Sequence, residues 1–133
     1  MTLFLLDTNA VSDLLRQPSG PVARAIAGRR DAEIVTSLIV AAELRYGAAR
    51  KASARLQAAV GTILKLVPVV SPEPPFDEVY GDLRARLEVS GIVLAPHDLL
   101  IAAHAMTLGA TLVTDDQVFS RVPGLAVENW VRP

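Results

Sequence analysis

The sequence predicts a three-layer α/β/α domain around a central parallel sheet of four or five short strands. Short apolar runs alternate with longer stretches of helical periodicity, which is the pattern of helices packed against both faces of such a sheet. The first run, Leu3 to Leu6, contains four consecutive large apolar residues, as expected for a strand covered on both faces. Of the 133 residues 51% are hydrophobic, so we expect one compact domain over residues 1–133.

The first half of the chain is expected to contain two strands and four helices. The first strand is followed by apolar residues at helical spacing, which predict a helix at 10–16. Pro21 suits the first turn of a second short helix. A strand at 33–36 then leads into a third helix, and a fourth is predicted at 53–66.

The second half is expected to contain the remaining three strands and two helices. The strand at 67–70 includes a proline, which favours the edge of the sheet, and the proline-rich segment after it is expected to form a loop. A helix follows at 76–90. A second helix at 98–108 is apolar on nearly every side and is therefore expected to be buried. Short strands at 111–114 and 125–130 complete the sheet.

Composition excludes several functional classes. The formal net charge is -1, with 13 Lys and Arg against 14 Asp and Glu, so charge alone gives no argument for nucleic-acid binding. The absence of cysteine removes disulfides, thiolate zinc sites and a cysteine nucleophile, and it is compatible with the cytoplasm. We expect neither a signal peptide nor a membrane span, because the apolar runs are too short. The motifs of P-loop, dinucleotide-binding, α/β-hydrolase and zincin sites are absent from the sequence.

Acidic residues stand where strands end or helices begin. Asp7 follows the first strand and Asp98 opens a helix. Asp115 and Asp116 follow the strand at 111–114. Each acid has an ordinary structural explanation, either a helix cap or a turn. A parallel sheet, however, gathers the carboxyl ends of its strands along one edge, so these acids are expected to lie close together.

Glu43 lacks such an explanation. It lies four residues after Ile39 and three before Tyr46, so we predict that it belongs to the apolar stripe of its helix, and no cation stands three or four positions away. A buried glutamate without a partner is costly, so either a distant arginine or a metal ion is expected to meet it. Two carboxylates about 4 Å apart repel by about 4 kcal/mol even at an effective dielectric constant of about 20. Convergence of the acids therefore predicts a bound cation, and oxygen ligands select Mg²⁺ or Mn²⁺.

Other polar residues have both a structural and a functional interpretation. His104 lies in an apolar helix and is expected to be a hydrogen-bonded core residue. His97 either contacts substrate or simply precedes that helix, and Tyr46 is either a core residue or a base-stacking ring. Four basic residues near Glu43 either bind phosphates or form a solvated helix face. They are Arg45, Arg50, Lys51 and Arg55.

Four segments follow one another in the order and spacing of a known family. They are Leu5-Leu6-Asp7-Thr8-Asn9, Ala42-Glu43-Leu44-Arg45-Tyr46-Gly47, His97-Asp98-Leu99-Leu100-Ile101-Ala102-Ala103-His104-Ala105, and Thr111-Leu112-Val113-Thr114 followed by the acidic pair. Together they resemble the motifs of PIN-domain ribonucleases, and most closely those of VapC/FitB-like toxins of prokaryotic type II toxin–antitoxin systems. The resemblance covers essentially the whole chain.

The resemblance implies a PIN-like fold and a set of site residues. Asp7, Glu43 and Asp98 match three acids of the family's site. The fourth position, Asp or Asn in the family, falls on Asp116, with Asp115 as the alternative because it adds a second acid. Asp7 and Asp98 would hold an ion directly. Glu43 and Asp116 would complete the site through water or a second ion.

The implied function is that of an endoribonuclease toxin that depends on Mg²⁺ or Mn²⁺ and hydrolyses RNA phosphodiester bonds with a metal-activated water. The implied partners are an RNA substrate, a second copy of the chain in a homodimer, and a cognate VapB-like antitoxin, all in the cytoplasm. The alternative is a PIN-like module that binds RNA or protein without cleaving it. The intact acids argue against that alternative, because such a module has little reason to keep an unpaired glutamate on an apolar face.

Overall fold

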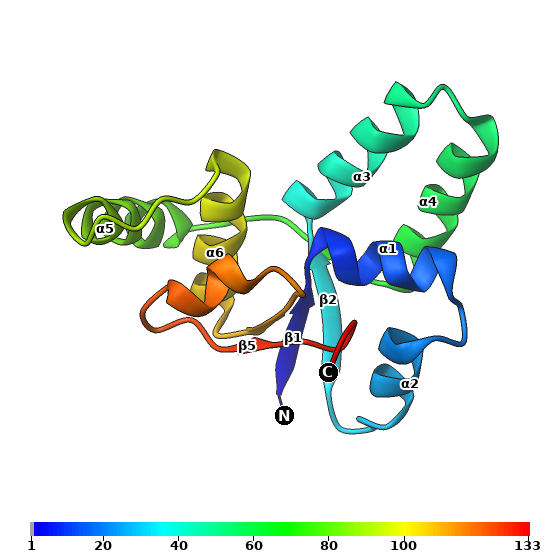
Figure 1. Ribbon diagram of the computed structural model, residues 1–133, viewed down its shortest axis with the longest axis horizontal. Coiled ribbons are helices and arrows are strands. Elements are labelled where there is room, and N and C mark those ends of the chain that lie inside the picture. Colours follow the sequence, from blue (N-terminus) through cyan, green and yellow to red (C-terminus); the bar gives the residue numbers. More distant parts are fainter. Residues whose placement is uncertain (1) are drawn as a thin grey trace.

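A five-stranded parallel sheet forms the centre of the computed structural model, which describes residues 2–133 (Figure 1). The predicted domain begins at Met1, which lies outside the described residues. The strand order is β3-β2-β1-β4-β5, and all four pairings are parallel. The strands are β1 (Leu3–Leu6), β2 (Glu33–Ser37), β3 (Val69–Val70), β4 (Thr111–Val113) and β5 (Val127–Glu128). The predicted fold class is confirmed, and the proline-containing strand β3 lies at an edge as expected.

Helices cover the sheet on both sides. α1, α3 and α4 contact one another, α5 contacts α6, and Figure 1 shows these two groups on opposite sides of the strands. None of the helices in residues 2–133 is long and apolar enough to cross a membrane. The helices are α1 (Thr8–Arg16), α2 (Pro21–Ala27), α3 (Leu38–Arg50), α4 (Ala54–Leu66), α5 (Phe76–Val89), α6 (Pro96–Leu108) and the short 3-10 helix η1 (Gln117–Arg121).

The core lies between the central strand and the helices that flank it. Leu5 and Leu6 of β1 are fully buried, which agrees with the prediction of a strand covered on both faces. Helix α6 is buried as predicted, with Ile101, Ala102 and Ala103 at 0% exposure. The helix that carries Asp98 is therefore fixed by packing along most of its length.

Element boundaries differ from the sequence-based expectation where capping decides them. α1 begins at Thr8, two residues earlier than predicted, because the Asp7 carboxylate itself caps it by accepting the Thr8 N–H at 2.8 Å. α6 also begins two residues early, with Pro96 in its first turn, so His97 belongs to the helix. The last strand contains only two of the six predicted residues, because the Asn129 side chain accepts backbone N–H groups in a turn directly after it. The η1 helix was not predicted.

A buried hydrogen bond joins α6 to the start of α3. The Ser37 hydroxyl caps α3 by accepting the Ile39 N–H at 3.1 Å, and the same oxygen lies 2.8 Å from His104 Nδ1. Both side chains are at 0% exposure, so His104 is the hydrogen-bonded core histidine that was predicted. Burial lowers the pKa of His104 and keeps the ring neutral. This bond fixes the helix that carries Glu43 against the helix that carries Asp98.

We expect Ser37→Ala to destabilise the protein by about 2–4 kcal/mol, because it removes a helix cap and also the hydrogen-bond partner of a buried imidazole. Ser53 is the matched control, since it caps α4 by accepting the Leu56 N–H and has no buried histidine beside it. Ser53→Ala should therefore cost only about 1 kcal/mol. Urea unfolding at neutral pH measures both values, and equal losses would show that the bond to His104 contributes nothing.

Candidate functional site

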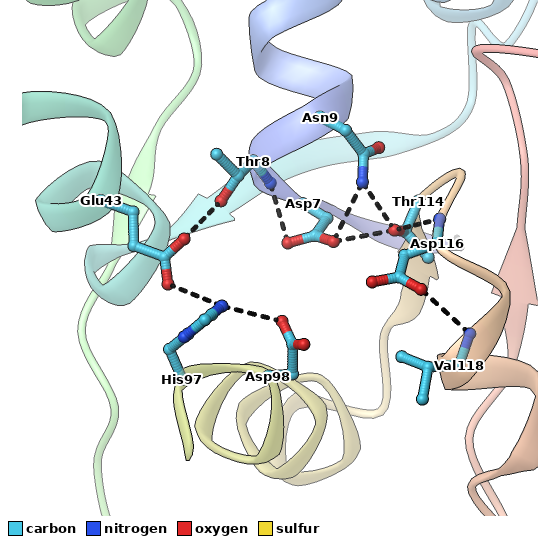
Figure 2. A network of polar contacts seen from close by, with 9 residues as sticks. All are labelled: Asp7, Thr8, Asn9, Glu43, His97, Asp98, Thr114, Asp116 and Val118. Carbon is cyan, nitrogen blue, oxygen red and sulfur yellow. Dashed lines mark hydrogen bonds and ion pairs between the residues drawn. The ribbon is translucent and has the colours of Figure 1, made fainter. Parts of the chain in front are cut away.

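The predicted acids meet at the carboxyl-terminal edge of the sheet. Asp7 directly follows β1, and its N–H donates to the carbonyl of Val113 at the end of the neighbouring strand β4. Glu43 comes from the second turn of α3, and Asp98 from the first turn of α6. Figure 2 shows these side chains around one space, together with Asp116, which precedes η1. Ligand sites of parallel α/β folds form at this edge.

One backbone N–H and two side chains fix the Asp7 carboxylate. The Thr8 N–H donates to its Oδ1 at 2.8 Å, and the Thr114 hydroxyl donates to its Oδ2 at 2.8 Å. Asn9 Nδ2 lies 3.3 Å from the same Oδ2 and 2.9 Å from Thr114 Oγ1 (Figure 2). Asp7 is only 4% exposed, so its carboxylate is both a helix cap and a fixed wall of the site.

Burial and like charges act on the acids together. The pKa of Asp7 is raised from 3.8 to about 6. Desolvation by burial is the largest cause, hydrogen bonds from Thr114 and Thr8 oppose it, and the charges of Asp98 and Glu43 add to it. The pKa of Asp98 is also raised, first by burial and then by Asp116 and Glu43, whereas His97 lowers it. Among residues 2–133, no lysine or arginine forms an ion pair with any of these four acids. The site therefore favours an added cation.

Glu43 has partners that its own helix does not supply. The Thr8 hydroxyl donates to Glu43 Oε2 at 3.2 Å, and His97 Nε2 lies 3.7 Å from Oε1. The buried Oε1 atom accepts no hydrogen bond from the described part of the chain. The predicted apolar stripe is wrong in part, because Tyr46 is 66% exposed and the buried face of α3 is instead formed by other residues.

Comparison with known proteins identifies the family. Residues 4–125 match the PIN domain family. The chain belongs to this family. Ribonuclease VapC2 of Rickettsia felis is 34% identical over an alignment of 131 residues, which covers 96% of this chain and 98% of that protein. A tRNA(fMet)-specific endonuclease VapC of Salmonella typhimurium is 30% identical over an alignment of 132 residues, which covers 98% of this chain and 99% of that protein.

Solved structures of PIN domains share the whole architecture. The crystal structure of VapBC2 from Rickettsia felis, bound to a DNA fragment from its promoter, superposes with a TM-score of 0.90 at 31% identity. The match covers 97% of this chain and 99% of that one. The resemblance to VapC proteins found in the sequence is therefore confirmed.

The structure separates the two acids that follow β4 of this PIN domain. Asp115 Oδ2 lies 3.2 Å from Arg132, and its backbone N–H donates to Asn9 Oδ1. Asp116 faces Asp98 closely enough to raise the pKa of that acid, while its Oδ1 accepts the Val118 N–H. Asp116 is thus the one whose carboxylate adds to the group around Asp7.

Thr114 was missed in the sequence, although it contacts both Asp7 and Asn9. The only signal was a hydroxyl residue at the end of a strand, directly before an acidic pair. The basic residues near Glu43 are exposed, and within residues 2–133 none of them forms an ion pair with the acids, which agrees with the solvated helix face. They are Arg45, Arg50, Lys51 and Arg55.

The carboxylate oxygens of the four acids suit a hard divalent cation, although these oxygens are not arranged around one point. Asp7, Glu43, Asp98 and Asp116 offer carboxylate oxygens, the ligands that Mg²⁺ and Mn²⁺ accept. One of these oxygens, Glu43 Oε1, is buried without a hydrogen bond in the described residues. Within residues 2–133 no group of three or more His, Asp or Glu side chains is arranged so that it could hold a metal ion as it stands. The residues fit an ion by the type of their donor atoms, and Glu43, Asp98 and Asp116 would have to turn toward the fixed Asp7 carboxylate to hold one.

The raised pKa of Asp7 predicts that its ionised form destabilises the metal-free fold. The shift from 3.8 to about 6 corresponds to about 3 kcal/mol at most in the free energy of unfolding. This stability is lost as the pH rises through that interval. We expect Asp7→Asn to increase the free energy of unfolding by about 1–3 kcal/mol at pH 7.5 in EDTA, and the difference to disappear toward pH 4. Urea unfolding at both pH values measures it.

Asp82→Asn on the exposed face of α5 is the control and should change stability by less than about 0.5 kcal/mol at either pH. A loss of stability in Asp7→Asn at pH 7.5 would show that the hydrogen bonds of Asp7 outweigh its burial.

Proposed function

We propose that the protein is a metal-dependent endoribonuclease, the toxin of a toxin–antitoxin system, which hydrolyses RNA phosphodiester bonds in the cytoplasm with Mg²⁺ or Mn²⁺. The observation that carries this proposal is the group of four acids at the sheet edge, which the described residues leave without a lysine or arginine partner. The names of its relatives as ribonucleases and endonucleases support the same activity.

Each acid has a distinct task in this proposal. Asp7 and Asp98 would hold the ion directly, while Glu43 and Asp116 would complete the site through water or a second ion. When bound, the ion supplies positive charge that activates a water and offsets the charge of the scissile phosphate. Asp98 or Glu43 would orient that water, and Glu43 has an oxygen free to do so because its Oε1 accepts no hydrogen bond in residues 2–133.

The hydrogen bonds of Asp7 preorganise the site. Thr8, Asn9 and Thr114 hold the carboxylate in one orientation before any ligand arrives. A group held in this way loses little freedom when the ion and the phosphate bind, so more of the binding energy is available to the reaction. The remaining side chains are more exposed and are free to adjust to the substrate.

We expect Asp7→Asn and Asp98→Asn each to lower the rate of RNA cleavage by at least about a hundredfold, because each removes a charge from the reacting centre. Both variants should also lose growth arrest on induction. EDTA should abolish cleavage by the native protein, and Mg²⁺ or Mn²⁺ should restore it.

Asp82→Asn is the control, because it changes the same residue type on an exposed helix face. Full activity in both site variants would exclude the proposed roles of the acids. RNA binding without metal-dependent cleavage by the native protein would support the non-cleaving module instead.

The antitoxin would cover the site from one side. A groove of about 260 Å³ between α1, α3 and α4 begins at Thr8 and Glu43. Leucines contribute much of its lining, and Arg16 and Lys51 also border it. The similar VapBC2 structure contains a VapB–VapC pair, which supports a protein partner of this kind. An antitoxin segment would fit this groove if its apolar side chains packed against the leucines and its basic group reached Glu43.

We expect the protein encoded next to this one in the genome to co-purify with it and to inhibit RNA cleavage. Leu56→Arg, within the groove, should weaken the complex by about tenfold or more, since it replaces an apolar contact with a charge. Leu66→Arg lies on the same helix at a position that is 73% exposed, and it should leave the affinity unchanged. Affinity measured for both variants by calorimetry checks this, and failure of the native pair to associate would refute the partner.

A further inference from the structure

The proposed mechanism gives no task to His97, whose imidazole ring lies among the acids. It is the second residue of α6, and its side chain is 53% exposed. Figure 2 shows its ring between Glu43 and Asp98. Its Nε2 lies 3.3 Å from Asp98 Oδ1 and 3.7 Å from Glu43 Oε1. One nitrogen thus approaches two oxygens that come from different helices.

We propose that His97 Nε2 is a ligand of the ion, so that the site has a mixed nitrogen and oxygen donor set and prefers divalent transition-metal ions, Mn²⁺ among them, to Mg²⁺. This inference rests on the proposed function, because it requires that an ion bind among the acids. It differs from that function in naming a nitrogen ligand besides the acids and an order of preference among ions.

The separations agree with donors that share an ion. Two ligands bound at about 2.1 Å in adjacent octahedral positions lie about 3 Å apart. The distances of 3.3 and 3.7 Å from Nε2 are close to this value, and the half-exposed ring can close the difference by a small rotation. Glu43 Oε1 accepts no hydrogen bond among the described residues, so it does not have to give up another partner in order to turn toward an ion.

The nitrogen determines the preference among ions. Mg²⁺ binds oxygen ligands and keeps several of its waters, so an imidazole adds little to its affinity. Divalent transition-metal ions bind imidazole nitrogen more strongly than Mg²⁺ does. Their affinity increases from Mn²⁺, the weakest of them, toward Cu²⁺. A site of carboxylates alone would discriminate less between Mn²⁺ and Mg²⁺.

The test compares the native protein with His97→Gln at pH 8. Calorimetry with each ion alone gives the dissociation constants for Mn²⁺ and Mg²⁺. We expect His97→Gln to weaken Mn²⁺ binding by about tenfold or more and Mg²⁺ binding by less than about twofold. His97 is exposed, so the variant should unfold at the same temperature as the native protein when no metal is present.

Pulsed electron paramagnetic resonance of bound Mn²⁺ gives a second readout that does not depend on activity. The chain has two histidines, and His104 is fully buried, so a coupling between Mn²⁺ and an imidazole nitrogen has His97 as its accessible source. The coupling should be present in the native protein and absent from His97→Gln.

The outcomes distinguish this inference from the proposed function. Mn²⁺ bound in the native protein and lost in Asp7→Asn, but without nitrogen coupling, would overturn the role of His97 and leave the metal site intact. Tighter binding of both ions by His97→Gln would also overturn it, because the ring would then be a competitor of the ion. Failure of the native protein to bind either ion would overturn both proposals.

Discussion

The burial of the Asp7 carboxylate beside other acids is the constraint on which this structure depends. The pKa of Asp7 is raised to about 6, first by desolvation and to a smaller extent by the charges of Asp98 and Glu43. Hydrogen bonds from Thr8 and Thr114 offset part of the free-energy cost of burying the Asp7 carboxylate, but they give it no countercharge. A helix cap alone would not require other acids to face it. Such an arrangement is expected to lower the stability of the free protein, and it fits the proposed site, in which a bound cation would compensate the charge.

The parallel topology explains how separate segments reach this point. β1 lies in the middle of the sheet, so the residues that follow β2 and β4 are its immediate neighbours at the carboxyl edge. α3 begins directly after β2 and presents Glu43 one and a half turns later, while Thr114 and Asp116 follow β4. α6 brings Asp98 from the opposite side of the sheet (Figure 1). Because each apolar run ends abruptly at a polar residue, this convergence could be predicted from the sequence.

Side-chain direction was harder to predict than element position. α3 has apolar residues on almost every side, so its sequence does not reveal which face packs against α1, α4 and α6. Tyr46 was therefore assigned to the same stripe as Glu43, whereas the structure leaves it exposed. The contacts of Thr114 with Asp7 and of His97 with Glu43 join residues far apart in the chain, and no local pattern encodes them. His104 was predictable because a histidine in an apolar helix has few alternatives to a buried hydrogen bond.

The two histidines of α6 show how one pair of helices can serve stability and chemistry together. They are seven residues apart, so they lie two turns apart on the same side of the helix, and both meet α3. His104 contacts Ser37 at the start of α3 in a fully buried position. His97 approaches Glu43, six residues further along α3, at an exposed position. The buried contact fixes the separation of the helices, and that separation sets how closely His97 and Asp98 approach Glu43. A change at the Ser37 end would therefore alter the geometry of the acids without touching any of them.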